Sequence, residues 1–181
     1  MKKYTQEEYN ELPIVDNFKQ CPTGDYTSIE YFGESCSFGE WCRFGEACRF
    51  DKACRFGELC SFGKACSFGE SCSFGRACRF GESCSFGESC SFGKSCRFGE
   101  WCSFGKSCVY ANINILNRHV YSVFGVGASK SIYGWLSTDG WYFQIGCFFG
   151  TETQARESIN KKYSSEHIYH DALNLIKKME V

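Results

Sequence analysis

Cysteine is the residue with the most chemical potential in this chain, which has 15 cysteines among 181 residues. Thirteen of them recur at every sixth position from Cys36 to Cys108, a regularity that neither disulfide scaffolds nor zinc modules show. Cysteines 18 residues apart, such as Cys36 and Cys54, would stack within reach of a disulfide or of a shared metal ion. A thiolate in a dry interior needs a compensating charge, and no neighbour in the repeat supplies one. We therefore interpret these cysteines as small apolar core residues that stay reduced.

Two other patterns have a chemical interpretation. His167 and His170 stand three residues apart on a predicted helix and could share a metal ion, but no third ligand is evident, so solvated helix residues are favoured. The stretch GVGASKS, residues 125–131, partly matches a phosphate loop. Ser129 precedes its Lys130 where that loop has glycine, and Phe124 stands at the first glycine position, so a loop between strands is favoured. We predict no metal, no cofactor and no catalytic residue.

The elements behind this spacing are thirteen tandem six-residue repeats, residues 32–109. Each opens with phenylalanine and has cysteine fifth, and glycine is second in all except the repeat with Asp51. Cysteine and the next phenylalanine lie two apart, so both face one side of a short strand. We expect the glycine to form a corner with left-handed or otherwise strained backbone, which aspartate tolerates. Three sides then close a triangular coil of 18 residues, and the coils stack about 4.8 Å apart.

This pattern resembles the hexapeptide repeat of left-handed parallel β-helix proteins, with phenylalanine in the aliphatic position and cysteine in the small one. Together with the stretch GWYFQIGCFFGT, residues 140–151, it is most similar to uncharacterised Phe-Gly-x-x-Cys-x repeat proteins of bacteria and their phages. The resemblance implies an all-β solenoid and a mobile-element context. Many hexapeptide proteins are acyltransferases and a few are carbonic anhydrases, and both need histidine on the coils. Residues 32–109 contain none, and His119 lies downstream.

The flanking segments predict a short N-terminal cap, residues 1–31, and a small α+β domain, residues 110–181. Thr5-x-x-Glu8 predicts a helix to about Glu11, and residues 26–31 predict a degenerate first turn. Strands are expected over 118–126, 131–137 and 141–149, with Asp139-Gly140 as a hairpin turn. Helices are expected from Thr151-x-x-Gln154 to Tyr163 and over 166–179, the latter with Ala172, Leu173, Leu175 and Ile176 on its apolar side.

The repeat surface supplies the candidate binding residues. At a period of 18, the residues Arg76, Arg79, Lys94 and Arg97 form a four-cation cluster on one face with no acid among them, and Arg43 shares that face. Beside them, Trp41 and Leu59 form an apolar strip, and Trp101 is a second outward tryptophan. Large exposed aromatic residues are typical of interfaces. Trp41 and Leu59 are therefore expected to contact a second subunit or the N-terminal segment.

These features predict a non-catalytic binding protein on a rigid scaffold, encoded by a phage or mobile element and directed at a host macromolecule. Its partner would be a host protein or protein–nucleic-acid complex with an acidic surface, for example a defence component. A hexapeptide-type acyltransferase and a structural virion component are the alternatives. The charges, 20 basic and 21 acidic, give no bulk field for nucleic acid. No apolar signal segment or membrane span is evident, so a cytoplasmic protein without membrane contact is expected. It could form homo-oligomers through a β-helix face or the C-terminal domain.

Overall fold

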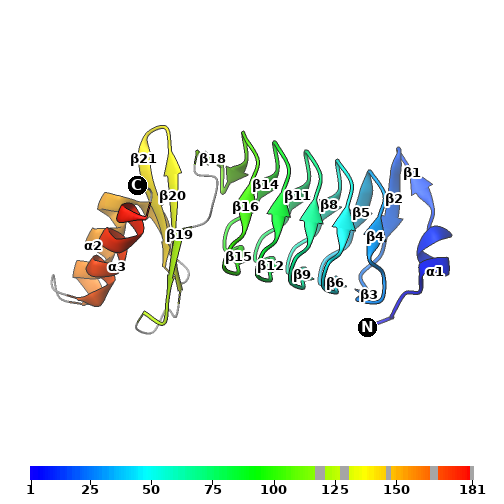
Figure 1. The fold of residues 1–181 in the computed structure, drawn as a ribbon, viewed down its shortest axis with the longest axis horizontal. Helices are drawn as coiled ribbons and strands as arrows, with labels where there is room; N and C mark the ends of the chain where they lie inside the picture. Colours follow the sequence, from blue (N-terminus) through cyan, green and yellow to red (C-terminus); the bar gives the residue numbers. More distant parts are fainter. Residues whose placement is uncertain (117–120, 127–130, 146–147, 164–166, 180–181) are drawn as a thin grey trace. The chain divides into compact units, whose positions relative to one another are not determined.

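The computed structural model describes residues 1–116, 121–126, 131–145, 148–163 and 167–179. The chain forms two compact units, Met1–Asn114 and Ile115–Val181 (Figure 1). In the first unit, one short helix, α1 (Gln6–Asn10), precedes a stack of coils. Each coil has three short strands, one in each of three sheets.

The three sheets run along the stack and are named sheets A, B and C. Sheet A has the order β15-β12-β9-β6-β3, with β3 Asp25–Tyr26, β6 Arg43–Phe44, β9 Ser61–Phe62, β12 Arg79–Phe80 and β15 Arg97–Phe98. Sheet C has the order β16-β13-β10-β7-β4, with β4 Tyr31–Phe32, β7 Arg49–Phe50, β10 Ser67–Phe68, β13 Ser85–Phe86 and β16 Ser103–Phe104. Sheet B has the order β1-β2-β5-β8-β11-β14-β17-β18, with β1 Ile14–Val15, β2 Phe18–Cys21, β5 Cys36–Phe38, β8 Arg55–Phe56, β11 Ser73–Phe74, β14 Ser91–Phe92, β17 Val109–Tyr110 and β18 Ile113–Asn114.

The register confirms the predicted period. Neighbouring repeat strands are parallel, and Ser67 and Phe68 stand opposite Ser85 and Phe86, an offset of 18 residues. The fold is therefore a parallel β-solenoid with a short N-terminal helix and a C-terminal α+β unit, as the repeat predicts. Sheet B ends in antiparallel strands on both sides, β1 on β2 and β18 on β17. These strands pair with what would otherwise be open strand edges of the coil stack.

Phenylalanine fills the interior in three parallel columns. Within a column the rings are stacked, as for Phe62 and Phe80 with centroids 4.9 Å apart and planes 3° apart. Between columns they meet edge to face, as for Phe62 and Phe68 at 5.0 Å and 88°. Edge-to-face pairs add about 0.5–1.5 kcal/mol each beyond the burial of area. Each ring is thus fixed by its own column and by the two others.

The glycine of the repeat has a different role from the predicted one. Among the described glycines only Gly125 and Gly140 have positive φ, whereas the fourth residue of every repeat does, for example Ala77 at 57°. The second position needs glycine because a Cβ on Gly75 would lie 2.7 Å from the backbone nitrogen of Glu58 in the preceding coil. The prediction of a left-handed glycine corner was therefore wrong. Close approach of stacked coils selects glycine, and the left-handed residue is the one before cysteine.

The N-terminal segment is continuous with the coils. Thr5 and Glu8 form the predicted capping box at the start of α1, and the buried Tyr9 of that helix packs edge-on against Phe32. Residues 26–31 form the expected degenerate turn between β3 and β4. Cys21 stands opposite Phe38, an offset of 17, so this cysteine occupies a phenylalanine position in the coil stack.

The second unit is one antiparallel sheet with two helices. The sheet has the order β19-β20-β21-β22, with β19 Tyr121–Phe124, β20 Ser131–Ser137, β21 Gly140–Ile145 and β22 Phe148–Thr151. The predicted hairpin at Asp139-Gly140 is confirmed, with Ser137 opposite Gly140. The single strand predicted over 141–149 is instead two strands, because β22 turns back to pair with β21. The part of the first predicted strand over 118–120 lies outside the described residues.

The helices are α2 (Glu152–Lys162), which begins with the predicted capping box, and α3 (Ile168–Lys178). Tyr169, Ala172, Leu173 and Ile176 of α3 are buried against the sheet, whereas Leu175 is 47% exposed, so its placement on the apolar side was wrong. Within the described residues, no helix is long and apolar enough to cross a membrane.

Candidate interaction surface

The thirteen repeat cysteines lie inside the coils with at most 1% of each side chain exposed, as predicted. Each thiol from Cys54 onward donates a weak hydrogen bond to a second-position carbonyl 21 residues earlier, as Cys60 does to Gly39 at 3.4 Å. Hydrogen bonds with the thiols of adjacent coils, together with burial, raise the pKa of Cys60 and of Cys84. Neutral thiols of this kind are poor nucleophiles and poor metal ligands. In the described residues, no three His, Cys, Asp or Glu side chains are arranged to hold a metal ion.

The two histidines of the second unit have partners within the protein. His167 precedes α3, where its Nδ1 accepts from the backbone N–H of Tyr169 at 3.3 Å and its ring stacks on Tyr163. His170 contacts Arg156 and Asn160, 3.3 and 2.8 Å away. Burial, followed by the charge of Arg156, lowers the pKa of His170. The favoured interpretation as solvated residues therefore needs correction, since packing and hydrogen bonds hold both rings. His119 and residues 127–130 of the loop over 125–131 lie outside the described residues.

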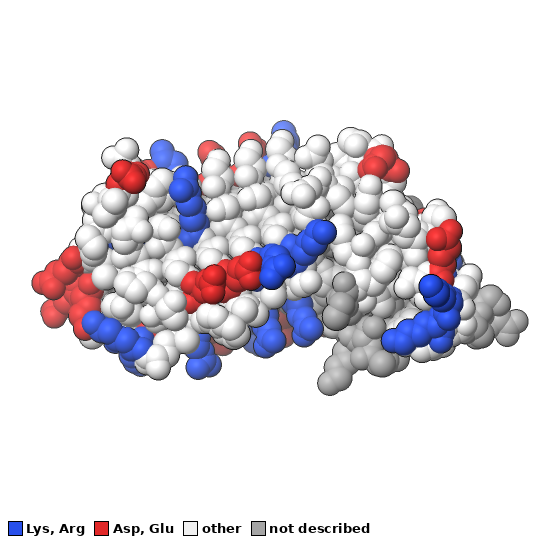
Figure 2. All heavy atoms as spheres, turned by 180° about the vertical axis from the view of Figure 1, so that it is seen from behind, with Lys and Arg blue, Asp and Glu red and all other residues white. Residues whose placement is uncertain are grey.

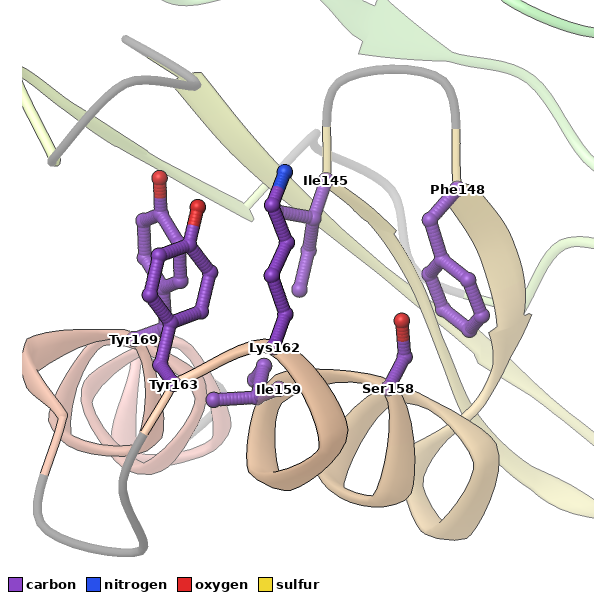
Figure 3. Close-up of a pocket in the computed structure, with 7 residues that line it drawn as sticks. All are labelled: Ile145, Phe148, Ser158, Ile159, Lys162, Tyr163 and Tyr169. Carbon is purple, nitrogen blue, oxygen red and sulfur yellow. The ribbon is translucent and has the colours of Figure 1, made fainter.

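The second unit also contains a small pocket of about 190 Å³ (Figure 3). Tyr163 and Tyr169 lie side by side at one end, with Lys162 between them and the apolar side chains of Ile145 and Phe148. The Lys162 ammonium lies 5.5 Å from the Tyr163 ring centroid. Among the described residues that line this pocket, no nucleophile is paired with a base.

Two rows of side chains follow the corner between sheets B and A. The charged row comprises the third-position residues Glu40, Glu58, Arg76 and Lys94, and the graded row comprises the fourth-position residues Trp41, Leu59, Ala77 and Ser95. Backbone hydrogen bonds between coils align them, from Trp41 N–H to Glu58 C=O, from Leu59 to Arg76 and from Ala77 to Lys94, at 2.9–3.0 Å. Figure 2 shows acidic side chains followed by basic ones in such a row, with few charges on the surface beside it.

One of the predicted binding cations is paired within the charged row. Arg76 donates to both carboxylate oxygens of Glu58, 18 residues earlier, at 3.1 and 3.4 Å. Glu58 lies one coil before the four cations, and Arg76 is the one of the four that has an acidic partner among the described residues. Acid and base at a spacing of 18 were visible in the sequence and could have indicated this pair, as they do for Lys64 with Glu82 and Lys52 with Glu34.

The sixth-position residues of sheet A form the arginine column Arg43, Ser61, Arg79 and Arg97. Arg43 stands opposite Asp25, whereas Arg79 stands directly opposite Arg97 in parallel register. Both side chains are exposed, and neither forms an ion pair with any described residue. Like charges directly opposite one another destabilise a sheet. The arginine column therefore contains two adjacent positive charges, Arg79 and Arg97, with no acidic partner among the described residues.

The predicted interface residues lie on the two corners that border sheet A. Trp41 is 55% exposed on the corner with sheet B, and Leu59 beside it is half-buried. Trp101 is a fourth-position residue on the corner between sheets A and C, and it is 81% exposed. The described N-terminal segment leaves more than half of Trp41 exposed.

Comparisons with known proteins give one match. A model of an RNA-binding, Nab2-type zinc-finger family of the CCCH type matches residues 31–45, 47–63, 59–75, 77–93 and 95–111, all within the solenoid and less than half of the chain. These stretches contain no histidine, which a CCCH finger uses as its fourth ligand, and their cysteines point into the core. No curated protein and no solved structure matches the chain.

Proposed function

We propose that the solenoid is a non-catalytic binding scaffold whose sheet A contacts an acidic segment of a partner protein. The observation that carries the proposal is the direct stacking of Arg79 on Arg97, with both guanidinium groups exposed and without an ion pair in the described residues. Stacking two cations opposes folding, and an external carboxylate would remove that cost. Arginine suits this role because its planar fork binds a carboxylate through two hydrogen bonds.

A protein partner fits this surface better than a nucleic acid. Nucleic-acid binding proteins commonly neutralise several phosphates, about 6–10 in strongly salt-dependent cases. The arginine column offers two uncompensated arginines, and the corner with sheet C carries Glu82 and Glu100 beside them. Glu82 is paired with Lys64, whereas Glu100 would repel a continuous phosphate backbone. The zinc-finger match alone supports the nucleic-acid alternative, which the experiment below tests.

The proposal includes a wider role drawn from the hexapeptide resemblance of the repeat. Proteins with similar Phe-Gly-x-x-Cys-x repeats occur in bacteria and phages, so the proposed partner is a host protein, for example a defence component. The absence of histidine from residues 32–109 supports a binding role over acyl transfer.

The test uses two defined probes, a fluorescent decaglutamate peptide and a ten-nucleotide RNA, with fluorescence anisotropy at low and moderate salt. We expect saturable binding of the peptide that weakens with salt, and at least about tenfold weaker binding by Arg79→Glu/Arg97→Glu. The double variant Arg49→Glu/Lys106→Glu is the matched control, because it makes the same change in net charge on other exposed positions.

Equal losses in the two double variants would show that only net charge matters, and would contradict the proposal. Tighter binding of RNA than of the peptide, lost in Arg79→Glu/Arg97→Glu, would replace the acidic protein by nucleic acid. No binding of either probe would reject the column as an anion-binding surface.

A further inference from the structure

The two rows on the corner between sheets B and A are complementary to themselves when reversed. From the N-terminal coil onward the charged row reads acid, acid, base, base, and the graded row reads large, large, small, small. A second copy related by a two-fold axis perpendicular to the stack would present each row in the opposite direction. Every acid would then face a base, and every large side chain would face a small one.

From this pattern we infer that the chain forms an antiparallel homodimer through this corner. Glu40 faces Lys94 of the second copy, and Glu58 faces Arg76 of the second copy. Trp41 faces Ser95 and Leu59 faces Ala77 in the same way. Such an interface is isologous, since each contact occurs twice, and closes after two copies.

The observed ion pairs agree with this arrangement. Arg76 and Glu58, the central members of the charged row, pair within one chain at 3.1 Å. Glu40 and Lys94, the outer members, are exposed and form no ion pair with a described residue. In the dimer the outer members find partners on the second copy, and the central pairs of both chains join one network of four charges.

The graded row explains the exposed tryptophan. Trp41 is 55% exposed although its left-handed backbone, φ 62°, already disfavours a large residue there. The corresponding position three coils later is Ser95, whose small side chain leaves room for an opposing indole. Tryptophan in a pocket of a partner is among the strongest contributors to association.

The neighbouring sheets show to which side the interface extends. On sheet A the same two-fold axis would place Arg43 against Arg97 of the second copy, which is repulsive. On sheet B it would place Ser37 against Ser91, and Arg55 against Ser73. Arg55 lies flat, with its guanidinium 3.9 Å from the centroid of the Phe18 ring. The dimer therefore extends over the small side chains of sheet B and leaves the arginine column open.

The test is a charge swap followed by sedimentation equilibrium. Wild-type protein is expected at twice the chain mass of 20.6 kDa. Lys94→Glu and Glu40→Lys each place like charges opposite one another twice, so each single variant should dissociate at least about a hundredfold more readily. The double variant Glu40→Lys/Lys94→Glu restores both contacts, and an equimolar mixture of the two single variants should form a heterodimer.

Lys106→Glu is the matched control, since it reverses an exposed lysine at the same repeat position on another corner, and it should dimerise like the wild type. Circular dichroism should give the same spectrum for all variants. A monomeric wild type, single variants that dimerise normally, or a mixture that stays monomeric would each overturn the inference. Arg79→Glu/Arg97→Glu should remain dimeric, so failure here is distinguishable from failure of peptide binding.

Discussion

At the scale of single residues, the second and fourth positions of the repeat have different requirements. The second position has no space for a Cβ, whereas the fourth has space but adopts left-handed backbone. Gly75 has no room for a Cβ, because the backbone of Gly57 and Glu58 would lie within 2.8 Å of it. Ala77, two residues later, has room for its methyl group but adopts left-handed backbone that costs an L-residue about 1–2 kcal/mol. The repeat keeps this residue left-handed because its N–H bonds to the next coil, at 3.0 Å from Lys94 C=O.

A matched pair of substitutions checks this difference. Gly75→Ala should lower the free energy of unfolding by about 2 kcal/mol, since backbone atoms of the preceding coil must move. Ala77→Gly should leave the free energy of unfolding unchanged or raise it by up to about 1 kcal/mol. Glycine removes the left-handed strain from the folded state, and this gain exceeds the loss caused by the greater conformational entropy of glycine in the unfolded chain. Urea denaturation measures both. Equal destabilisation by the two variants would show that the left-handed residue carries no strain.

At the scale of elements, helix α2 of the second unit depends on its first turn. Thr151 accepts from the backbone N–H of Gln154 at 3.3 Å, and the Gln154 side chain accepts from the Thr151 N–H at 3.0 Å. Glu152 then links this end of α2 to α3 through Lys177 at 2.8 Å. Although burial acts to raise it, hydrogen bonds from Lys177 and Arg156 lower the pKa of Glu152.

Substitution of the capping residue tests that dependence. Thr151→Ala should destabilise the second unit by about 1 kcal/mol, because the backbone N–H of Gln154 loses its acceptor, the Thr151 hydroxyl. Thr153→Ala, at an exposed position inside the same first turn, should be neutral or slightly stabilising, since alanine favours helix. Hydrogen exchange of the amides in α2 reports both effects. Equal exchange rates in the two variants would contradict the role of the cap.

At the scale of the whole molecule, the buried thiols Cys60 and Cys84 make folding stability depend on pH. Their pKa in the unfolded chain is about 8.5, and hydrogen bonds with adjacent thiols, with burial, raise the pKa of Cys60 and Cys84 in the folded state. The folded chain therefore keeps the protons of Cys60 and Cys84 at a pH at which the unfolded chain releases them. The contribution of these protonated thiols to the free energy of unfolding is fully present below about pH 8.5. It falls as the pH rises above that value.

The raised pKa of Cys60 and Cys84 predicts destabilisation at alkaline pH. Each thiol that stays protonated in the fold costs about 1.4 kcal/mol of stability per pH unit above about pH 8.5. With a reductant present, the urea midpoint should be constant from pH 7 to 8 and should fall strongly by pH 9.5. Native protein should react slowly with a thiol reagent, and all cysteines should react after denaturation. A midpoint that stays constant to pH 9.5 would show that the thiols ionise equally in both states.

Much of the solenoid was predictable because its sequence repeats one local solution. The period of six, the inward cysteine and phenylalanine and the coil of 18 residues follow from side-chain alternation along a strand. The capping boxes at Thr5 and Thr151 and the turn at Asp139-Gly140 are equally local, and the structure confirms them.

The sequence by itself therefore determined the coil, its core and the places where the helices begin, since these depend on neighbours close along the chain. Only the tertiary structure decided why the second residue is glycine and which cations remain unpaired. Both depend on the coil above or below, where backbone comes within 2.7 Å of a missing Cβ and Glu58 reaches Arg76. Residues 18 apart can be aligned from the sequence alone. Which of them form an ion pair, however, depends on the distance that stacking of the coils sets between their side chains.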